Sequence, residues 1–350
     1  TGREDRRVRE RLARSGLFAS VGDPVLAPGL EPDAVLLKLD VTEPAYTRFG
    51  GLLGVSGREG NVSGFVDLEL RNIAGTAREG AAFWESRGEG LTRFRLSYRE
   101  PWLPYLPVGV FGSIRHDVNA EAYSFTRWEI LGSAEWGGSW RFQFGRTGSR
   151  AVTLLTEAGR SEEQSRSTEG AFSVGIAFDR RDSAVNPQRG YLLRIESSRG
   201  TKTLEVPADS SRVRFDRTRW GGFTEGYAPL SGRLLLVNEL AFEFLDSPED
   251  SLPRWDQVGV GGARSVRGYR EEQWLTRGTL YSRNELRWIQ DARGSAVYLL
   301  ADVGFIQEGG RGVRDLFDRF LFGAGVGVRQ ASRLGVLGVE YAVPRGTNVL

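Results

Sequence analysis

The sequence lacks cysteine and methionine, and it contains a single histidine. Without cysteine the chain can form neither a disulfide nor a thiolate metal site. A histidine-based triad could draw only on His116, which has no nucleophile elbow near it, and no group of residues has metal-ligand spacing. We therefore expect no catalytic residue, no metal and no cofactor. The missing initiator methionine predicts a processed chain or a fragment of a longer one.

Long apolar runs are also missing, since the longest are as short as Leu234–Val237. A transmembrane helix needs about 20 consecutive apolar residues, so the sequence excludes one. A membrane β-barrel remains open, because its strands alternate apolar and polar residues instead. The formal net charge is only +2, which gives no general attraction for nucleic acid, so we expect no such partner.

The first 45 residues differ in pattern from the rest of the chain. Glu4–Ser15 is charged and carries apolar residues on one face at helical spacing. Leu17–Ala27 and Ala34–Val41 then alternate as two strands would. One helix and two strands bury little core, so residues 1–45 are interpreted as the end of a small α+β domain.

From Tyr46 onward the pattern is of strands separated by turn residues. In Thr92–Arg99 three arginines alternate with Phe94, Leu96 and Tyr98, which favours a wet lumen on one face and lipid on the other. About fifteen such runs follow one another, and the sequence predicts a membrane β-barrel over residues 46–350. The runs are 47–56, 63–72, 78–87, 91–100, 107–117, 121–136, 138–147, 170–180, 190–201, 211–228, 232–245, 278–289, 295–307, 319–329 and 334–343.

The connections support a barrel as well. Short links follow most even runs, and the long links predicted after odd runs are 148–169, 202–210, 246–277 and 308–318. Such barrels have short turns on one side and longer loops on the other, and bacterial single-chain examples close on an even number of strands. We therefore expect a 16-stranded design whose last strand is missing; the alternative is that one run was split or overlooked.

The segment 246–277 is an unusually long polar loop between two strands. Within it, Gly261–Trp274 has the sequence GGARSVRGYREEQW, in which Gly268 permits a sharp turn. Loops of this length are usually functional or disordered. We interpret this one as folding inward into the lumen, where charge pairing holds it.

Two motifs carry a family resemblance. Val266-Arg267-Gly268-Tyr269, preceded by two glycines, resembles the sixth-loop signature of the BamA/TamA outer-membrane assembly superfamily. Asp179-Arg180-Arg181-Asp182, followed by Pro187 and Gly190, is similar to the D-x-R-D…P-x-x-G segment after the eighth strand of that superfamily. Residues 1–45, with Gly16–Phe18 before a strand, resemble the end of a POTRA domain.

The resemblance implies that Arg267 docks inside the barrel against acidic residues of the twelfth and thirteenth strands. The matching positions are Glu285 and Asp302, and alternation independently places both on the polar face. Two unit charges at about 4 Å attract by roughly 4 kcal/mol at an effective dielectric near 20, before desolvation. The alternative is that Arg267 is a solvated loop residue and that both acids are ordinary lumen charges.

The function implied by the resemblance is insertion of unfolded β-barrel proteins into a bacterial outer membrane, without a chemical reaction. The clients would be those unfolded barrels, and a periplasmic POTRA domain would offer a surface to accessory proteins. Gly50, Gly51 and Gly54 weaken the first strand, so the seam could accept a client strand. The alternatives are a two-partner secretion transporter, a passive porin, and a barrel fused to an upstream enzyme such as a patatin-like lipase.

Overall fold

The computed structural model shows a chain that is almost entirely β. It describes residues 9, 12, 17–18, 20–28, 35–42, 47–56, 61–86, 90–103, 106, 108–119, 122–157, 160–184, 186–206, 211–291, 294–307, 317–332 and 335–345. No helix in this described part is long and apolar enough to cross a bilayer.

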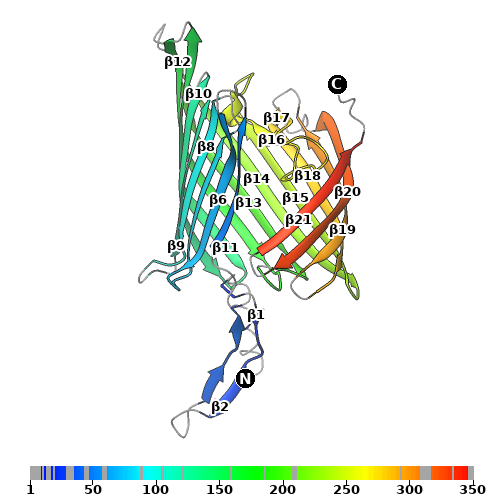
Figure 1. Ribbon diagram of the computed structural model, residues 1–350. Helices are drawn as coiled ribbons and strands as arrows, with labels where there is room; N and C mark the ends of the chain where they lie inside the picture. Colours follow the sequence, from blue (N-terminus) through cyan, green and yellow to red (C-terminus); the bar gives the residue numbers. More distant parts are fainter. Residues whose placement is uncertain are drawn as a thin grey trace.

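Two short pairs of strands form the N-terminal part, which hangs below the main sheet in Figure 1. β1 (Ser20–Val21) pairs with β4 (Val41–Thr42), and β2 (Val25–Pro28) pairs with β3 (Val35–Lys38), both antiparallel. The two strands predicted here therefore pair, although each is interrupted. Nearly all of the helix predicted at Glu4–Ser15 lies outside the described residues, and the POTRA assignment stays a prediction.

The rest of the described chain forms one antiparallel sheet of fifteen strands in the order β21-β20-β19-β18-β15, followed in descending order by β14 to β5. Its strands are β5 (Thr47–Ser56), β6 (Asn61–Ile73), β7 (Arg78–Ser86), β8 (Leu91–Glu100), β9 (Val108–Asn119), β10 (Tyr123–Trp136), β11 (Trp140–Glu157), β12 (Arg160–Asp179), β13 (Gly190–Val206), β14 (Ser211–Ser231), β15 (Leu234–Asp246), β18 (Gly278–Ile289), β19 (Ala296–Ile306), β20 (Arg319–Ser332) and β21 (Gly335–Pro344). The number of runs predicted from alternation is thus confirmed.

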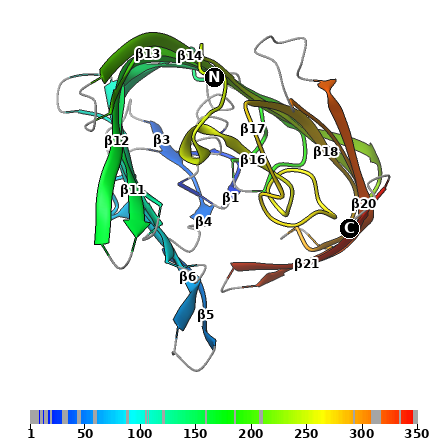
Figure 2. The ribbon, with the colours of Figure 1, turned by 90° about the horizontal axis from the view of Figure 1, so that it is seen from above.

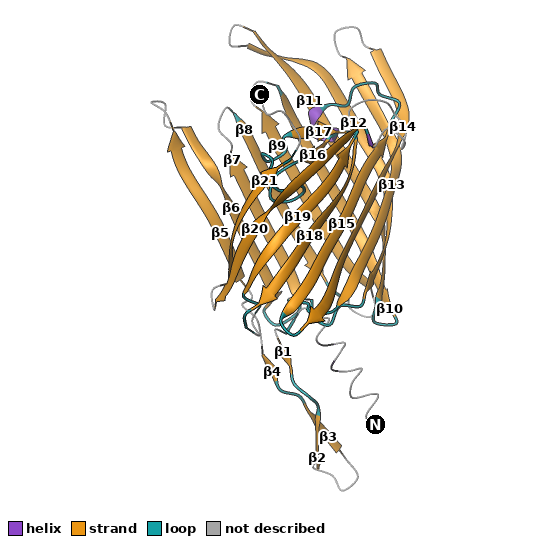
Figure 3. Cartoon of the chain, turned by 90° about the vertical axis from the view of Figure 1, so that its right-hand side faces the viewer, coloured by secondary structure: helices purple, strands orange, loops and turns teal. Residues whose placement is uncertain are grey.

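This sheet curves around a lumen but is not closed. The strands slant side by side around it (Figure 3), and a view from above shows β5 splayed away from β21 (Figure 2). Within the described residues no pairing joins β5 to β21, so these two strands are the edges of the sheet. Closure with sixteen strands stays a prediction.

Side chains alternate across the sheet as the sequence predicted. Leu96 and Leu299 point outward and are 48% and 60% exposed, whereas Leu300 and Asp302 point inward and are 3% and 0% exposed. The outer face is therefore apolar and the inner face carries the charges, which is the arrangement of a barrel that faces lipid outside and water inside.

Two of the long connections predicted from the sequence are wrong. The hairpin of β11 and β12 fills most of 148–169, and β13 continues through Lys202 to Val206. Figure 1 shows that the upper end of this hairpin, at the β12 label, reaches beyond the strands beside it. The stretch Arg160–Glu169 is polar throughout, so it gave no apolar alternation, yet cross-strand bonds such as Thr153 Oγ1 to Ser165 Oγ at 2.6 Å hold it as strand.

The segment 246–277, called the lumen loop below, folds into the curve of the sheet. It contains a short helix, η1 (Arg254–Asp256), and a small hairpin of β16 (Val258–Val260) and β17 (Trp274–Thr276). Figure 2 shows this hairpin inside the arc of strands. The arginine motif lies in the turn between β16 and β17.

Candidate functional site: a loop docked in the lumen

Arg267, at the tip of the lumen loop, is bound to the wall strand β19 through Asp302. Its Nε donates to Asp302 Oδ2 at 2.7 Å and its Nη2 donates to Asp302 Oδ1 at 2.8 Å. The backbone N–H of Arg267 donates to Oδ2 as well, at 3.0 Å. Both side chains are almost inaccessible, at 3% and 0% exposed. A planar guanidinium matches a carboxylate in this two-bond geometry.

Two further carboxylates meet the same guanidinium. Arg267 Nη1 donates to Glu285 Oε1 on β18 at 2.6 Å and to Glu340 Oε1 on β21 at 3.2 Å. The other oxygen of Glu285 accepts from Arg287 Nε at 2.7 Å. Burial alone would lower the pKa of Arg267, but Asp302 and then Glu285 raise that pKa above its usual value. Arg267 is therefore a permanent cation in this position.

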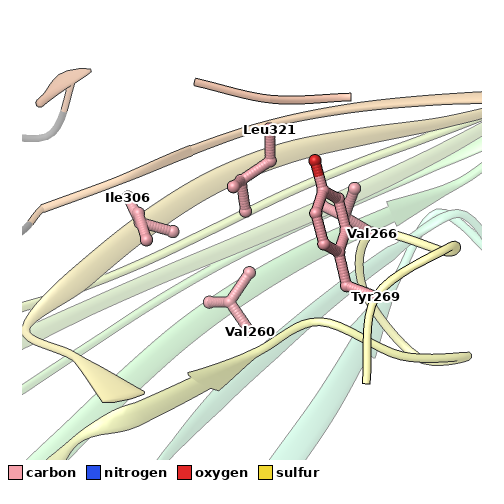
Figure 4. Close-up of a cluster of buried hydrophobic side chains, with 5 residues drawn as sticks. All are labelled: Val260, Val266, Tyr269, Ile306 and Leu321. Carbon is pink, nitrogen blue, oxygen red and sulfur yellow. The ribbon is translucent and has the colours of Figure 1, made fainter. Parts of the chain in front are cut away.

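A small apolar cluster seals the arginine motif against the wall. Val260, Val266 and Tyr269 of the lumen loop pack with Ile306 of β19 and Leu321 of β20 (Figure 4). Three of these side chains are fully buried: Val260, Val266 and Leu321 are each 0% exposed. The cluster excludes water on one side of the loop tip, which strengthens the neighbouring ionic contacts.

Glycines on both sides make this close approach possible. Gly268 has φ of +98°, and a Cβ there would lie 2.8 Å from the backbone of Val343. On the wall, a Cβ at Gly323 would lie 1.8 Å from the carbonyl oxygen of Arg267, and one at Gly304 would lie 2.6 Å from Val266 Cγ2. The motif and the two wall glycines therefore fit one another only in the absence of side chains.

The base of the lumen loop is held by ion pairs in which the loop supplies the acids and the wall supplies the cations, the reverse of the arrangement at the tip. Asp256, in η1, accepts from Lys202 Nζ on β13 and from Arg217 Nη1 on β14, both at 2.9 Å. Glu249 accepts from Lys202 Nζ at 2.8 Å. Burial would raise the pKa of Asp256, but Arg217 and Lys202 lower that pKa well below its usual range. We call Asp256, Glu249, Lys202 and Arg217 the base cluster.

The lumen loop therefore bridges two walls of the sheet. Beside the base cluster, Trp255 packs against Tyr123 and Phe125 of β10, with ring centroids 4.9 and 6.2 Å away. Glu272 lies 3.5 Å from Arg93 of β8. These contacts hold the loop to β8–β14, whereas Arg267 holds its tip to β18–β21.

The structure brings the predicted loop and wall residues together. Val266, Arg267, Gly268 and Tyr269 lie against the wall, and Glu285 and Asp302 are the acids that the sequence analysis had named. Sequence reasoning missed Glu340 and the whole base cluster. Lys202 was missed because it was placed in a connection, and Asp256 because its partners lie on strands distant in sequence.

The second motif closes the turn between β12 and β13, at the other end of the sheet from the lumen loop. Arg181 donates to both oxygens of Asp179, at 3.0 and 2.7 Å, and also to Glu225 of β14. Asp182 Oδ1 accepts the backbone N–H groups of Gln188 and Arg189. Pro187 is buried, and a Cβ at Gly190 would meet the carbonyl oxygen of Arg180. These residues form a turn separate from the arginine site.

The predicted seam glycines lie on the edge strand β5. Gly50, Gly51 and Gly54 pair in regular register with Asp67, Val66 and Ser63 of β6. A Cβ at Gly50 would touch nothing within 4 Å, so that position is open. A weak seam at these glycines stays a prediction.

Comparison with known proteins places these features in context. A family model described as the Omp85 superfamily domain matches residues 72–348. The "Sorting and assembly machinery component 50 homolog" of Mus musculus is 31% identical over 304 residues, which are 76% of this chain and 57% of the relative. The Homo sapiens protein of that name is 29% identical over 219 residues, which are 55% of this chain and 43% of the relative. The chain thus spans about half the length of the curated relatives that it matches.

Two solved structures are similar in fold. BamA from Haemophilus ducreyi lacking POTRA domains 1–3 is 16% identical, with a TM-score of 0.57 over 98% of this chain and 75% of that one. CdiB from Escherichia coli is 13% identical, with a TM-score of 0.60 over 96% of this chain and 65% of that one. At these identities the similarity is one of fold.

Proposed function

Because this chain belongs to the Omp85 superfamily, we propose that it inserts unfolded β-barrel proteins into an outer membrane. The resemblance carried by the two sequence motifs is confirmed at the level of the superfamily, whose β-barrels sit in outer membranes. In this proposal the clients are unfolded outer-membrane barrels, and the work is done by strand pairing, without a chemical reaction, metal or cofactor.

The observation that carries the proposal is that the sheet of the described residues is open, with β5 and β21 as its two edges. Unpaired backbone groups are costly in lipid, so an edge strand at the seam favours pairing with any strand that can reach it. A client strand could add to β5 or β21 by β-augmentation. Gly50, Gly51 and Gly54 would keep β5 easy to displace, because glycine weakens a strand.

The membrane placement is part of the same proposal. The apolar outer face would contact lipid, in an outer membrane of the bacterial type. Residues 1–45 would then be the last part of a periplasmic POTRA domain, through which accessory proteins bind. In this proposal the seam between β5 and β21 is closed when no client is engaged.

The experiment is to lock the seam. Since the chain has no cysteine, one cysteine in β5 and one in β21 can be joined by a short bifunctional reagent in liposomes. Folding of an added unfolded barrel protein is followed by its resistance to heat in gel electrophoresis. The proposal expects insertion to stop on cross-linking; insertion at the original rate would refute it. The matched control joins cysteines at Phe49 and Leu68, which are partners within β5 and β6.

A secretion transporter of the same superfamily is the second candidate, because the sheet curves around a lumen and the lumen loop lies inside it. It predicts passage of an unfolded polypeptide through the lumen into the liposome, with the lumen loop displaced. A passive porin is disfavoured by the docked loop inside the lumen. It predicts a large conductance that Arg267→Ala leaves unchanged, which a planar-bilayer recording measures.

A further inference from the structure

Glu340 lies on the edge strand β21, yet its carboxylate is bound by groups that belong to β19 and to the lumen loop. Tyr298 of β19, Gly327 of β20 and Glu340 of β21 are successive partners in register across the three strands. The hydroxyl of Tyr298 donates to Glu340 Oε1 at 2.7 Å, so the tyrosine reaches across the strand between them.

Gly327 makes that reach possible. A Cβ at Gly327 would lie 2.3 Å from Cζ of Tyr298, which means that the ring lies directly over this glycine. Tyr298 is only 5% exposed, so its orientation is fixed by packing. Any other residue at 327 would push the ring off the strand and take its hydroxyl away from Glu340.

The lumen loop contacts the same edge strand at two points. Arg267 Nη1 donates to the oxygen of Glu340 that also accepts from Tyr298. Further along β21, the backbone of Gly268 lies against Val343 and Pro344. Besides its pairing with β20, β21 thus has a second attachment, which is to the lumen loop.

From this geometry we propose that Glu340 is a positioning residue that couples the edge strand β21 to the docked state of the lumen loop. With Arg267 docked, Glu340 is held and β21 stays on the sheet. When the loop leaves the wall, β21 loses its second attachment and opens more readily. By linkage the converse holds, so that displacing β21 weakens docking of the loop. The inference rests on the proposed function only in the point that a client strand would pair with β21.

The test measures hydrogen–deuterium exchange of the full chain in liposomes, without any client. Local opening sets the exchange rate of each strand. Arg267→Ala alters no residue of β21. We nevertheless expect it to speed exchange in β21 by about tenfold, the factor that loss of one charged hydrogen bond gives. Glu340→Gln is expected to speed exchange in both β21 and residues 261–274. Tyr298→Phe, which removes only the hydroxyl, is expected to give a smaller change in β21.

The control is Glu129→Gln, a lumen carboxylate on β10 that accepts from Ser113 of β9. It should leave β21 unchanged, and exchange in β10 and β11 reports whether each variant is folded. If Arg267→Ala does not fold, Arg267→Lys takes its place. A loop that exchanges faster while β21 keeps its original rate would overturn the proposal, as would unchanged exchange of β21 in Glu340→Gln. If the exchange data show the coupling but the original chain does not insert a client, that result counts against the proposed function alone.

Discussion

Arg267 and Asp302 lie 35 positions apart in the sequence and are joined by two parallel hydrogen bonds, Nε to Oδ2 and Nη2 to Oδ1. A third bond, from the backbone N–H of Arg267 to Oδ2, fixes the main chain of the loop as well as its side chain. Asp302 therefore binds both the guanidinium, which only arginine supplies, and the backbone at this position of the loop.

Replacing Arg267 should release the tip of the lumen loop in a graded way. Removing one partner of a buried ion pair costs roughly 3–5 kcal/mol, because the other charge is left unpaired. Arg267→Ala should therefore expose the tip, and Arg267→Lys, which keeps the charge but loses the fork, should do so partly. Cleavage by chymotrypsin in intact liposomes measures this, since the substitutions leave its aromatic cleavage sites intact. Arg264→Ala, at an exposed position in the same loop, is the control; equal protection of all three variants would contradict the docking.

Gly323→Ala should undock the tip without altering any charge. The added Cβ would lie 1.8 Å from the carbonyl oxygen of Arg267, and backbone cannot move aside as a flexible side chain can. Chymotrypsin sensitivity near that of Arg267→Ala is expected. Gly170→Ala, in β12, meets nothing within 4 Å and serves as the matched glycine control. Full protection of Gly323→Ala would show that the loop tip does not approach the wall so closely.

Alternation along single strands was enough to predict that the two acidic partners of Arg267 face the lumen. It placed Glu285 and Asp302 on the inner face without knowledge of the fold, because a side chain's face depends only on its position within its own strand. Glu340 could not be assigned in this way. Its role depends on the register of three strands and on a glycine that lets Tyr298 cross between them, and neither is visible in one segment.

The base cluster could not be predicted from the sequence, for a different reason. Lys202 belongs to a strand that continues past the apolar band, where the alternate positions Thr201, Thr203 and Glu205 are polar and the apolar outer face is lost. Strand pairing persists there through cross-strand polar contacts, so the predicted connections at 148–169 and 202–210 were too long. Asp256 in turn meets Lys202 and Arg217 only once the lumen loop has folded inward.

The base of the loop should resist acid. The pKa of Asp256 is lower in the folded protein than in the unfolded chain, because Arg217 and Lys202 outweigh the effect of burial. Its contribution is present above the ordinary carboxyl pKa of about 4 and is lost as the pH falls through the lower, folded value. We expect the base to stay docked at about pH 4 and to release only in stronger acid.

Fluorescence of Trp255, taken as the difference between the original chain and Trp255→Phe, measures this release, since the Trp255 ring packs against Tyr123. In Asp256→Asn the contribution of that carboxylate to the pH dependence should disappear. Release with a midpoint above about pH 4 in the original chain would contradict the assignment.

Arg181→Ala should weaken the turn between β12 and β13 and leave the lumen loop docked. Its guanidinium binds Asp179 and Glu225 in a partly buried setting, and loss of charged hydrogen bonds of this kind costs about 2 kcal/mol. A lower urea midpoint with unchanged chymotrypsin protection of the loop is expected. Arg180→Ala, next to it, is exposed and should change the midpoint little. Exposure of the loop in Arg181→Ala would show that the two motifs are coupled.

The most direct test of the account is a double-mutant cycle between Arg267 and Asp302, with chymotrypsin protection of the lumen loop in liposomes as the measured quantity. The account predicts that Arg267→Ala and Asp302→Ala each remove protection, and that the double variant is no less protected than either single one, because each substitution breaks the same pair. Losses of protection that simply add, as for two independent sites, would show that this pair does not hold the loop in the lumen.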